Sequence, residues 1–414
     1  VETQNFLYEI LSPLGGGGGA MAADSTPSPV SEPYAVFRNE IAMTSVRCPS
    51  PDSAVLDYLS LDFDEDAKDE GRIVANPRNL PEIKGNWSPV PWRSLEANWF
   101  QANSRIKSPM LRLHKEILEF SDFLSPTPEE GQRRLAAVEA VSDVIKYIWP
   151  CSQVEIFGSF KTGLYLPSSD IDVVILGSNI TSPKIGLQAL SRALSCSGIA
   201  KKIQVIANAR VPIIKFVEKN SGFSFDISFD MNNGPKAAEF IKDAMSKWPP
   251  LRPLCLILKI FLQQRELNEV YTGGIGSYAL LSMLIATFMV QKDCHGSPDY
   301  NLGVLLVNFF DIYGRKLNAT DVGVSCNGGG EVFFRKMTKG FASQPNRIAI
   351  EDPQASDNDI GKSSFNYFKA RSAFAMAFAA LTDTKAIMRL GPDQSILGAI
   401  IRPDAVLLER KGES

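Results

Sequence analysis

One segment constrains the fold of this chain more than any other: FGSFKTGLYLPSSDID, from Phe157 to Asp172. Apolar residues at both of its ends predict two strands, joined by a loop rich in Gly, Pro and Ser. Residues i and i+2 of a strand point to the same face, so the side chains of Asp170 and Asp172 project together. Two carboxylates this close repel each other unless a cation lies between them. The segment therefore predicts a strand–loop–strand unit that holds a divalent cation, since Mg²⁺ prefers carboxylate oxygens.

A third carboxylate follows on a separate predicted strand. Asp226 lies in FSFDISF, residues 223–229, between apolar neighbours. Three carboxylates around two divalent ions would activate an attacking hydroxyl and stabilise a departing pyrophosphate. Gly158 lets the backbone approach a phosphate, and the Ser159 hydroxyl can donate a hydrogen bond to it. A DxD pair alone is a weak signal, because solvated acids at a strand edge give the same pattern; the whole combination favours nucleotidyl transfer.

The remaining pattern predicts an α+β chain. Strands are expected at 154–157, 171–176, 203–206, 211–216 and 223–229, with a helix over 184–197. These elements give a mixed sheet with helices on one face. Thr127 is expected to cap a helix over 128–147, and another helix precedes it. Beyond Lys236, apolar runs predict a region built of helices, over 253–264, 275–291, 302–312 and 366–381.

The expected domains follow from these patterns. Residues 1–90 are rich in Gly, Ser and Pro and carry an acidic run, so we expect a disordered leader. A catalytic domain is expected over 128–235, and a helical domain over 92–127 and 236–404. The apolar run over 275–290 is shorter than the roughly 20 residues that cross a membrane. We therefore expect a buried helix there and no membrane association.

Composition excludes several other kinds of site. The formal net charge is -3, and the 6 cysteines are scattered without a CxxC pair. Neither a zinc site nor a disulfide framework is therefore expected. The 2 histidines, His114 and His295, argue against a His-dependent catalytic triad. No RRM-like, KH or zinc-knuckle signature is present, which predicts weak RNA affinity for the chain alone.

At these motifs the chain resembles the DNA polymerase β-like nucleotidyltransferase superfamily and, more closely, the poly(A) polymerases of nuclear RNA surveillance, the catalytic subunits of TRAMP-type complexes. The likeness covers about 92–404. Besides the first segment it includes ARVPIIK from Ala209, DISF from Asp226, LKIFL from Leu258, TGGIGSY from Thr272 and IEDP from Ile350. The resemblance implies a polymerase β-like catalytic domain, an all-helical central domain, and template-independent addition of AMP from ATP to RNA 3′ ends.

The resemblance also implies a role for each candidate site residue. The catalytic and metal-binding residues would be Asp170, Asp172 and Asp226, with two Mg²⁺ or Mn²⁺ ions. The nucleotide-binding residues would be Gly158, Ser159, Gly234, Lys259, Ser277, Tyr278, Asn358 and Lys362. Without the resemblance, Lys259 would be interpreted as a lysine whose stem covers apolar surface, and Ser277 and Tyr278 as the start of a buried helix.

The expected base preference depends on residues 350–362, which resemble the family's nucleotide-recognition loop. Related terminal uridylyltransferases commonly have His at the position of Asn358, and this chain has no His after His295. An Asn side chain offers adenine both a donor and an acceptor, so ATP is favoured. Lys362, where Arg is common, keeps the charge but loses the bidentate geometry.

RNA contacts are expected at Arg210 and Lys215, near strands that lead to Asp226; Lys201 and Lys202 fit a solvated basic edge equally well. The resemblance implies RNA 3′ ends, a zinc-knuckle RNA-binding protein, an RNA helicase and, indirectly, the exosome as partners. It also implies the nucleus as location, with the nucleolus as a further option. Three alternatives stay open: a uridylyltransferase or relaxed-specificity enzyme, a small-molecule nucleotidyltransferase, and an inactive scaffold.

Overall fold

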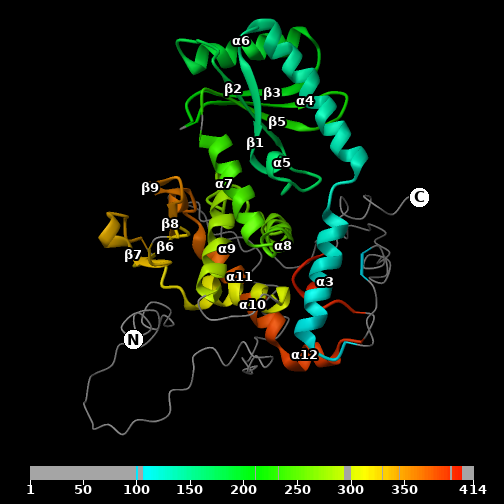
Figure 1. The fold of residues 1–414 in the computed structure, drawn as a ribbon, viewed down its shortest axis with the longest axis vertical. Coiled ribbons are helices and arrows are strands. Elements are labelled where there is room, and N and C mark those ends of the chain that lie inside the picture. Colours follow the sequence, from blue (N-terminus) through cyan, green and yellow to red (C-terminus); the bar gives the residue numbers. More distant parts are fainter. Residues whose placement is uncertain are drawn as a thin grey trace, which may run out of the picture.

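The computed structural model describes residues 99–100, 106–209, 211–231, 233–292, 300–328, 330–344, 346–391 and 394–402. The predicted leader over 1–90, the residues 403–404 and the candidate RNA contact Arg210 lie outside the described residues. The described elements form the α+β chain that the sequence predicts, with a five-stranded sheet in one half and helices with a smaller sheet in the other (Figure 1).

The five-stranded sheet carries the segment from which the sequence analysis started. Its strands are β1 (Gln153–Phe157), β2 (Ile171–Leu176), β3 (Ala200–Ile206), β4 (Ile213–Glu218) and β5 (Ser224–Phe229). Their spatial order is β1-β2-β5-β4-β3. Strands β2 and β5 run parallel, and the other neighbouring strands are antiparallel. The predicted mixed sheet is confirmed.

Helices α4 (Pro128–Ile148) and α6 (Pro183–Cys196) cover one face of this sheet (Figure 1). The core on that face takes alternate residues of β2 and β5, namely Ile171, Val173, Ile175, Phe225, Ile227 and Phe229. Because side chains alternate along a strand, Asp172 and Asp226 point to the opposite face. Helix α4 begins with the predicted N-cap: Thr127 Oγ1 accepts from the Glu130 amide at 3.2 Å, and Glu130 Oε2 accepts from the Thr127 amide at 2.8 Å.

The other half contains the remaining helices. The α-helices are α3 (Pro109–Leu124), α7 (Asn233–Lys247), α8 (Leu251–Gln263), α9 (Ser277–Lys292), α10 (Leu302–Asp311), α11 (Tyr367–Thr382) and α12 (Thr384–Arg389). A π-helical turn, η3 (Ile312–Lys316), extends α10, and the 3-10 turns are η4 (Lys336–Lys339), η5 (Ile360–Ser363) and η6 (Leu397–Ala399). Helix α9, the apolar run of the sequence, is buried among the other helices as expected. Over the part of the chain that the structure describes, no helix has both the length and the apolar character of a membrane span.

The region beyond Lys236 is not purely helical, which corrects the expected all-helical domain. It also holds β6 (Val322–Val324), β7 (Phe333–Arg335), β8 (Ala349–Asp352) and β9 (Ala355–Asp359), in the order β7-β6-β8-β9. Strands of three to five residues are too short to show a clear alternation of apolar and polar residues. The sheet matters for function because β8 and β9 carry most of the predicted nucleotide-recognition loop.

The buried residues form two main clusters. One joins α4 and α6 to the five-stranded sheet, and the other joins α3 to the helices from α7 onward. Leu164 and Leu166, from the loop before β2, belong to the second cluster. The loop that carries Asp170 is therefore anchored in the helical half. The domain limits given by the sequence stay a prediction, although the two clusters divide α3 from α4.

Candidate active site

The strand register places two carboxylates and one amine in a row. Asp172 of β2 pairs with Asp226 of β5, which pairs with Lys215 of β4. Residues paired across a sheet share a face, so these side chains lie together on the face away from α4 and α6. Asp170, just before β2, joins them: Lys215 Nζ lies 3.5 Å from Asp170 Oδ2 and 2.7 Å from Asp226 Oδ2. The structure therefore brings all three candidate acids to one site.

The electrostatics of this site favour cations. Burial, followed by the charges of Asp226 and Asp170, raises the pKa of Asp172 to about 7. Burial also raises the pKa of Asp226, although its hydrogen bond with Lys215 opposes that effect. Within the described residues, no three acidic, histidine or cysteine side chains lie close enough to enclose a metal ion as they stand. The donor set still fits hard divalent cations, because clustered carboxylates are the ligands these ions prefer.

Gly158 lies directly against Asp172. Its φ is +63°, and a Cβ at this position would overlap Oδ2 of Asp172 and come within 2.8 Å of its Cγ. Only glycine satisfies both conditions, because other residues strain at this φ and have a Cβ. Gly158 opens the short helix α5 (Gly158–Thr162), so Ser159 follows at the site. The glycine–serine bend and the carboxylate are thus one packed unit.

Arg134, which the sequence analysis missed, fixes the turn before Asp170. It lies on α4, is 1% exposed, and stacks its guanidinium 4.5 Å from the ring centroid of Phe223. The guanidinium donates to three carbonyls of the turn: those of Pro167 at 2.9 Å, Ser169 at 3.0 Å and Leu166 at 3.4 Å. A buried fork of donors bound to three acceptors holds the turn in one position. The signal in the sequence is the helical spacing, because Arg134 shares the buried face of α4 with Ala137, Val141 and Ile145, whereas its neighbour Arg133 is exposed.

Helix α8 holds the same loop from the helical half. Lys259 Nζ donates to the carbonyl of Leu164 at 2.8 Å, and Gln263 Nε2 donates to Ser168 Oγ at 3.1 Å. Burial lowers the pKa of Lys259, while the Asp172 charge acts in the opposite direction. The amine of Lys259 therefore joins α8 to the loop before β2, and its positive charge interacts with Asp172.

A cleft of about 1360 Å³ separates the two halves. It is lined by Asp172 and by all eight candidate nucleotide-binding residues: Gly158, Ser159, Gly234, Lys259, Ser277, Tyr278, Asn358 and Lys362. Asp170 and Asp226 are not among its lining residues. Sites for small ligands commonly measure roughly 300–1,000 Å³, so this cleft is large enough for a nucleotide.

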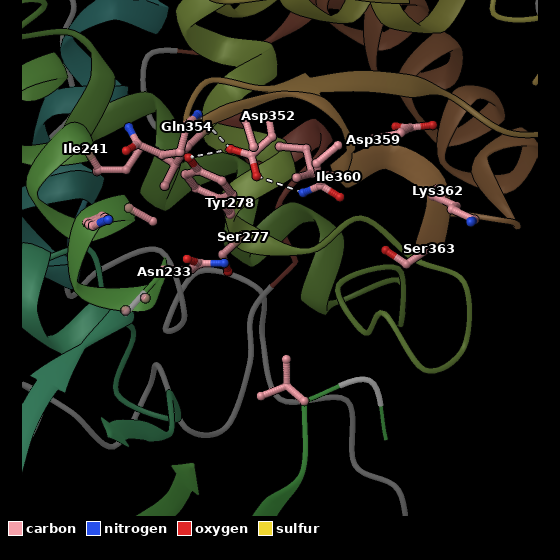
Figure 2. A pocket seen from close by; sticks show the side chains of 18 of the residues that line it. Asn233, Ile241, Ser277, Tyr278, Asp352, Gln354, Asp359, Ile360, Lys362 and Ser363 are labelled. Carbon is pink, nitrogen blue, oxygen red and sulfur yellow. Dashed lines mark hydrogen bonds between the residues drawn. The ribbon is translucent and has the colours of Figure 1, made fainter. Parts of the chain in front are cut away.

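Asp352 organises the far wall of the cleft (Figure 2). The Tyr278 hydroxyl donates to Asp352 Oδ1 at 3.3 Å, and Asn358 Nδ2 donates to Asp352 Oδ2 at 2.8 Å. The Gln354 amide also donates to Oδ1, at 2.9 Å. Burial and the Asp352 charge raise the pKa of Tyr278, so its hydroxyl stays a donor. The sequence analysis quoted Asp352 only as part of a motif and missed that it joins Tyr278 to Asn358.

Comparisons with known proteins agree with this geometry. The model of the mitochondrial-like poly(A) RNA polymerase central palm domain matches residues 113–243, and the Cid1 family poly A polymerase model matches residues 301–358. The poly(A) RNA polymerase CID14 of Cryptococcus neoformans is 38% identical over 75% of this chain and 41% of its own length. The solved polymerase core of TRAMP, an RNA surveillance complex, is 35% identical with a TM-score of 0.66, over 71% of this chain and 94% of that chain. The chain belongs to the poly(A) RNA polymerase family.

Membership of the family leaves the activity of this member open. Protein Trf4-2 of Drosophila melanogaster is 37% identical over 65% of this chain and 68% of its own length, and it is named as an inactive poly(A) RNA polymerase protein. The chain spans about half the length of the curated relatives it matches, 41% and 51% for two of them. Activity, substrates and partners therefore have to be argued from the site.

Two of the candidate site residues, Gly234 and Lys215, have contacts in the structure that the sequence did not reveal. A Cβ on Gly234 would come within 2.5 Å of Cδ2 of Phe157, so packing of α7 on β1 already requires a glycine here, whatever it does for a nucleotide sugar. Lys215, a candidate RNA contact, is bonded to Asp170 and Asp226. The amine of Lys215 therefore forms ion pairs with the two carboxylates in this structure. Lys201 and Lys202 lie exposed on the edge strand β3.

Proposed function

We propose that this protein is a poly(A) RNA polymerase that adds AMP from ATP to RNA 3′ ends without a template. One observation carries the proposal: Asp172 and Asp226 are paired across β2 and β5, beside a cleft that contains the nucleotide-binding candidates. A small-molecule nucleotidyltransferase would share the glycine–serine bend and the paired acids, but not family membership over both halves of the chain.

The chemistry follows from the charges around the cleft. Asp170, Asp172 and Asp226 would hold two divalent cations, Mg²⁺ or Mn²⁺, which supply activation of the RNA 3′-hydroxyl and stabilisation of the departing pyrophosphate. Lys259 adds a cation where triphosphate charge accumulates, and its bond to the Leu164 carbonyl holds it in place beforehand. Tyr278 offers a ring for the base, with its hydroxyl tied to Asp352.

The assay that tests the activity extends a labelled oligo(A) primer with each of the four nucleotides, in Mg²⁺ or in Mn²⁺. We expect extension with ATP, and a loss of at least about 10³-fold in the double variant Asp170→Ala, Asp172→Ala. Glu139→Ala with Asp143→Ala is the matched control, because it removes two exposed acids from α4. Equal rates for both double variants would remove the carboxylates from the mechanism.

ATP is the proposed substrate because Asn358 lies in the cleft, with its amide bonded to Asp352. Terminal uridylyl transfer is the second candidate, and a relaxed preference is the third. Replacement of Asn358 by His should raise the rate with UTP relative to ATP by about tenfold, since one well-placed base contact discriminates by 1–3 kcal/mol. An unaltered ratio in Asn358→His would show that the loop does not choose the base.

An inactive scaffold is the alternative from another class, and the inactive Drosophila relative gives it weight. This chain retains all three acids, which favours activity. If the wild-type chain extends no primer even with a partner added, the scaffold interpretation gains and the enzyme proposal is lost.

We extend the proposal to a role in nuclear RNA surveillance. The supporting observation is the relation to the polymerase core of TRAMP, an RNA surveillance complex, at 35% identity. RNA 3′ ends, a zinc-knuckle RNA-binding protein and an RNA helicase would be its partners, with the exosome acting downstream. Co-purification of tagged protein from nuclear extract, followed by mass spectrometry, tests this set.

A further inference from the structure

Tyr271 is a highly exposed aromatic residue on a hydrogen-bonded turn. The side chain is 94% exposed. The backbone around it is closed by hydrogen bonds from the Gly273 amide to the Val270 carbonyl at 3.0 Å and from the Gly274 amide to the Glu269 carbonyl at 2.8 Å. The Thr272 hydroxyl adds a bond to the same Glu269 carbonyl at 3.0 Å. The exposed ring of Tyr271 is thus carried by a hydrogen-bonded turn.

This turn lies beside the candidate active site. Ser277, which lines the cleft, follows Tyr271 after the short segment Thr272–Gly276. Tyr271 is therefore close in sequence to a residue that lines the cleft.

A second exposed ring comes from a distant part of the sequence. Phe365 is 41% exposed and lies against the backbone of Gly273, where a Cβ would come within 2.6 Å of its ring. The Asn366 amide donates to the Gly273 carbonyl at 3.0 Å, and Asn366 Nδ2 donates to the Thr272 carbonyl at 2.7 Å. These contacts join the turn to the chain that leaves the cleft.

Cations accompany the second ring. Lys362 and Ser363, just before Phe365, line the cleft. Lys369 follows on α11 and is exposed, with its amine 6.0 Å from the ring centroid of Phe368. Single-stranded nucleic acids bind to surfaces of this composition, because every base has a π face for an aromatic ring and every phosphate attracts a cation. A single exposed ring is ordinary, whereas here two exposed rings stand on segments that are hydrogen-bonded to each other next to the cleft.

We propose that Tyr271 and Phe365 form a stacking surface for the terminal bases of the single-stranded RNA that is to be extended. The proposal rests on the proposed function and adds to it the place where the primer is held. Recognition by stacking is tolerant of sequence. The surface would therefore accept RNA 3′ ends of many sequences, and it would act on the RNA rather than on ATP.

The experiment is a steady-state comparison of primer extension by the full chain and three variants. Tyr271→Ala should raise the KM for the RNA primer about tenfold, which corresponds to the loss of one stacked base. Tyr271→Trp should restore the wild-type value, because stacking needs a ring and no hydroxyl. Tyr147→Ala is the matched control, since Tyr147 is 88% exposed on α4. The KM for ATP and the melting temperature should stay unchanged in all three.

Two other outcomes would overturn the proposal. An unchanged KM for RNA in Tyr271→Ala, with normal extension, would remove Tyr271 from the RNA path while leaving the polymerase intact. A rise in the KM for ATP alone would place the ring on the nucleotide. Photocrosslinking of a primer that carries a 4-thiouridine near its 3′ end measures RNA contact independently of primer extension. If the chain incorporates no nucleotide, the proposed polymerase function is wrong. In that case a crosslink to residues 269–273 would still support RNA contact at Tyr271, and crosslinks found only elsewhere would contradict it.

Discussion

Gly158 and Asp172 show how a single missing methyl group can decide activity. Gly158→Ala should destabilise the fold by about 1–2 kcal/mol, because alanine strains at a φ of +63°. It should also reduce extension at least about tenfold, because the new Cβ displaces the Asp172 carboxylate. Urea unfolding and primer extension measure the two effects.

The control for this substitution is Gly177→Ala. Gly177 has a φ of +67°, but nothing lies within 4 Å of its ideal Cβ. The same loss of stability with normal extension is expected. Equal activity of the two variants would mean that the carboxylate does not need the space at Gly158.

The raised pKa of Asp172 makes stability depend on pH. Its ordinary pKa is 3.8, and in the fold it is about 7. Between these values the folded chain keeps a proton that the unfolded chain has lost, so the free energy of unfolding falls as pH rises through this window. Asp172→Asn abolishes this titration. Its stability relative to wild type should rise by on the order of 4 kcal/mol from pH 4 to pH 8, at 1.36 kcal/mol per pKa unit.

Urea unfolding in EDTA across this pH range measures the difference. EDTA is needed because bound cations would favour the ionised carboxylate and hide the effect. Stability curves of Asp172→Asn and wild type that run parallel in pH would contradict the raised pKa.

At the scale of elements, α4 and the turn before β2 depend on Arg134. Arg134→Met would leave three carbonyls without their donor, which should cost about 3 kcal/mol. Arg134→Lys keeps a cation but not the fork. Its kcat should fall about 10- to 100-fold with little change in the KM for ATP, because Asp170 shifts while the cleft wall does not. Arg133→Lys, exposed one residue earlier, is the control, and a kcat as low as that of Arg134→Lys would reject the role of the turn.

The sequence predicted those elements whose signal is local. Strands β1, β2 and β5 carry strong apolar patterns, and the start of α4 is signalled by Thr127 and Glu130, so these were found within a residue or two. The strands β6 to β9 were missed because each is short and owes its conformation to neighbours distant in sequence. Arg134 was missed for a related reason: its partners lie more than 30 residues away.

At the scale of the whole molecule, the cleft unites residues that lie far apart in sequence. Motif positions from Gly158 to Lys362 line one cavity, although composition and periodicity give no hint of their proximity. The resemblance to a family gave the expected role of each residue, and the structure showed that these residues lie around one cleft. The link from Tyr278 to Asn358 through Asp352 could not be predicted, because a sequence motif does not specify which side chains are hydrogen-bonded to each other.

A bound nucleotide should join the two halves of the molecule. Because the cleft takes its lining from both halves, we expect Mg²⁺-ATP to bind the folded chain and to have no comparable site in the unfolded one. At a hundredfold excess over Kd, this linkage adds about 2.7 kcal/mol to the free energy of unfolding. For a chain of this size the melting temperature should rise by about 2–4 °C, and UTP at the same concentration should raise it less. Lys259→Met, which removes a cation shared by both halves, should abolish the shift, whereas Lys146→Met on the outer face of α4 should preserve it. A full shift in Lys259→Met would mean that the triphosphate is held elsewhere in the cleft.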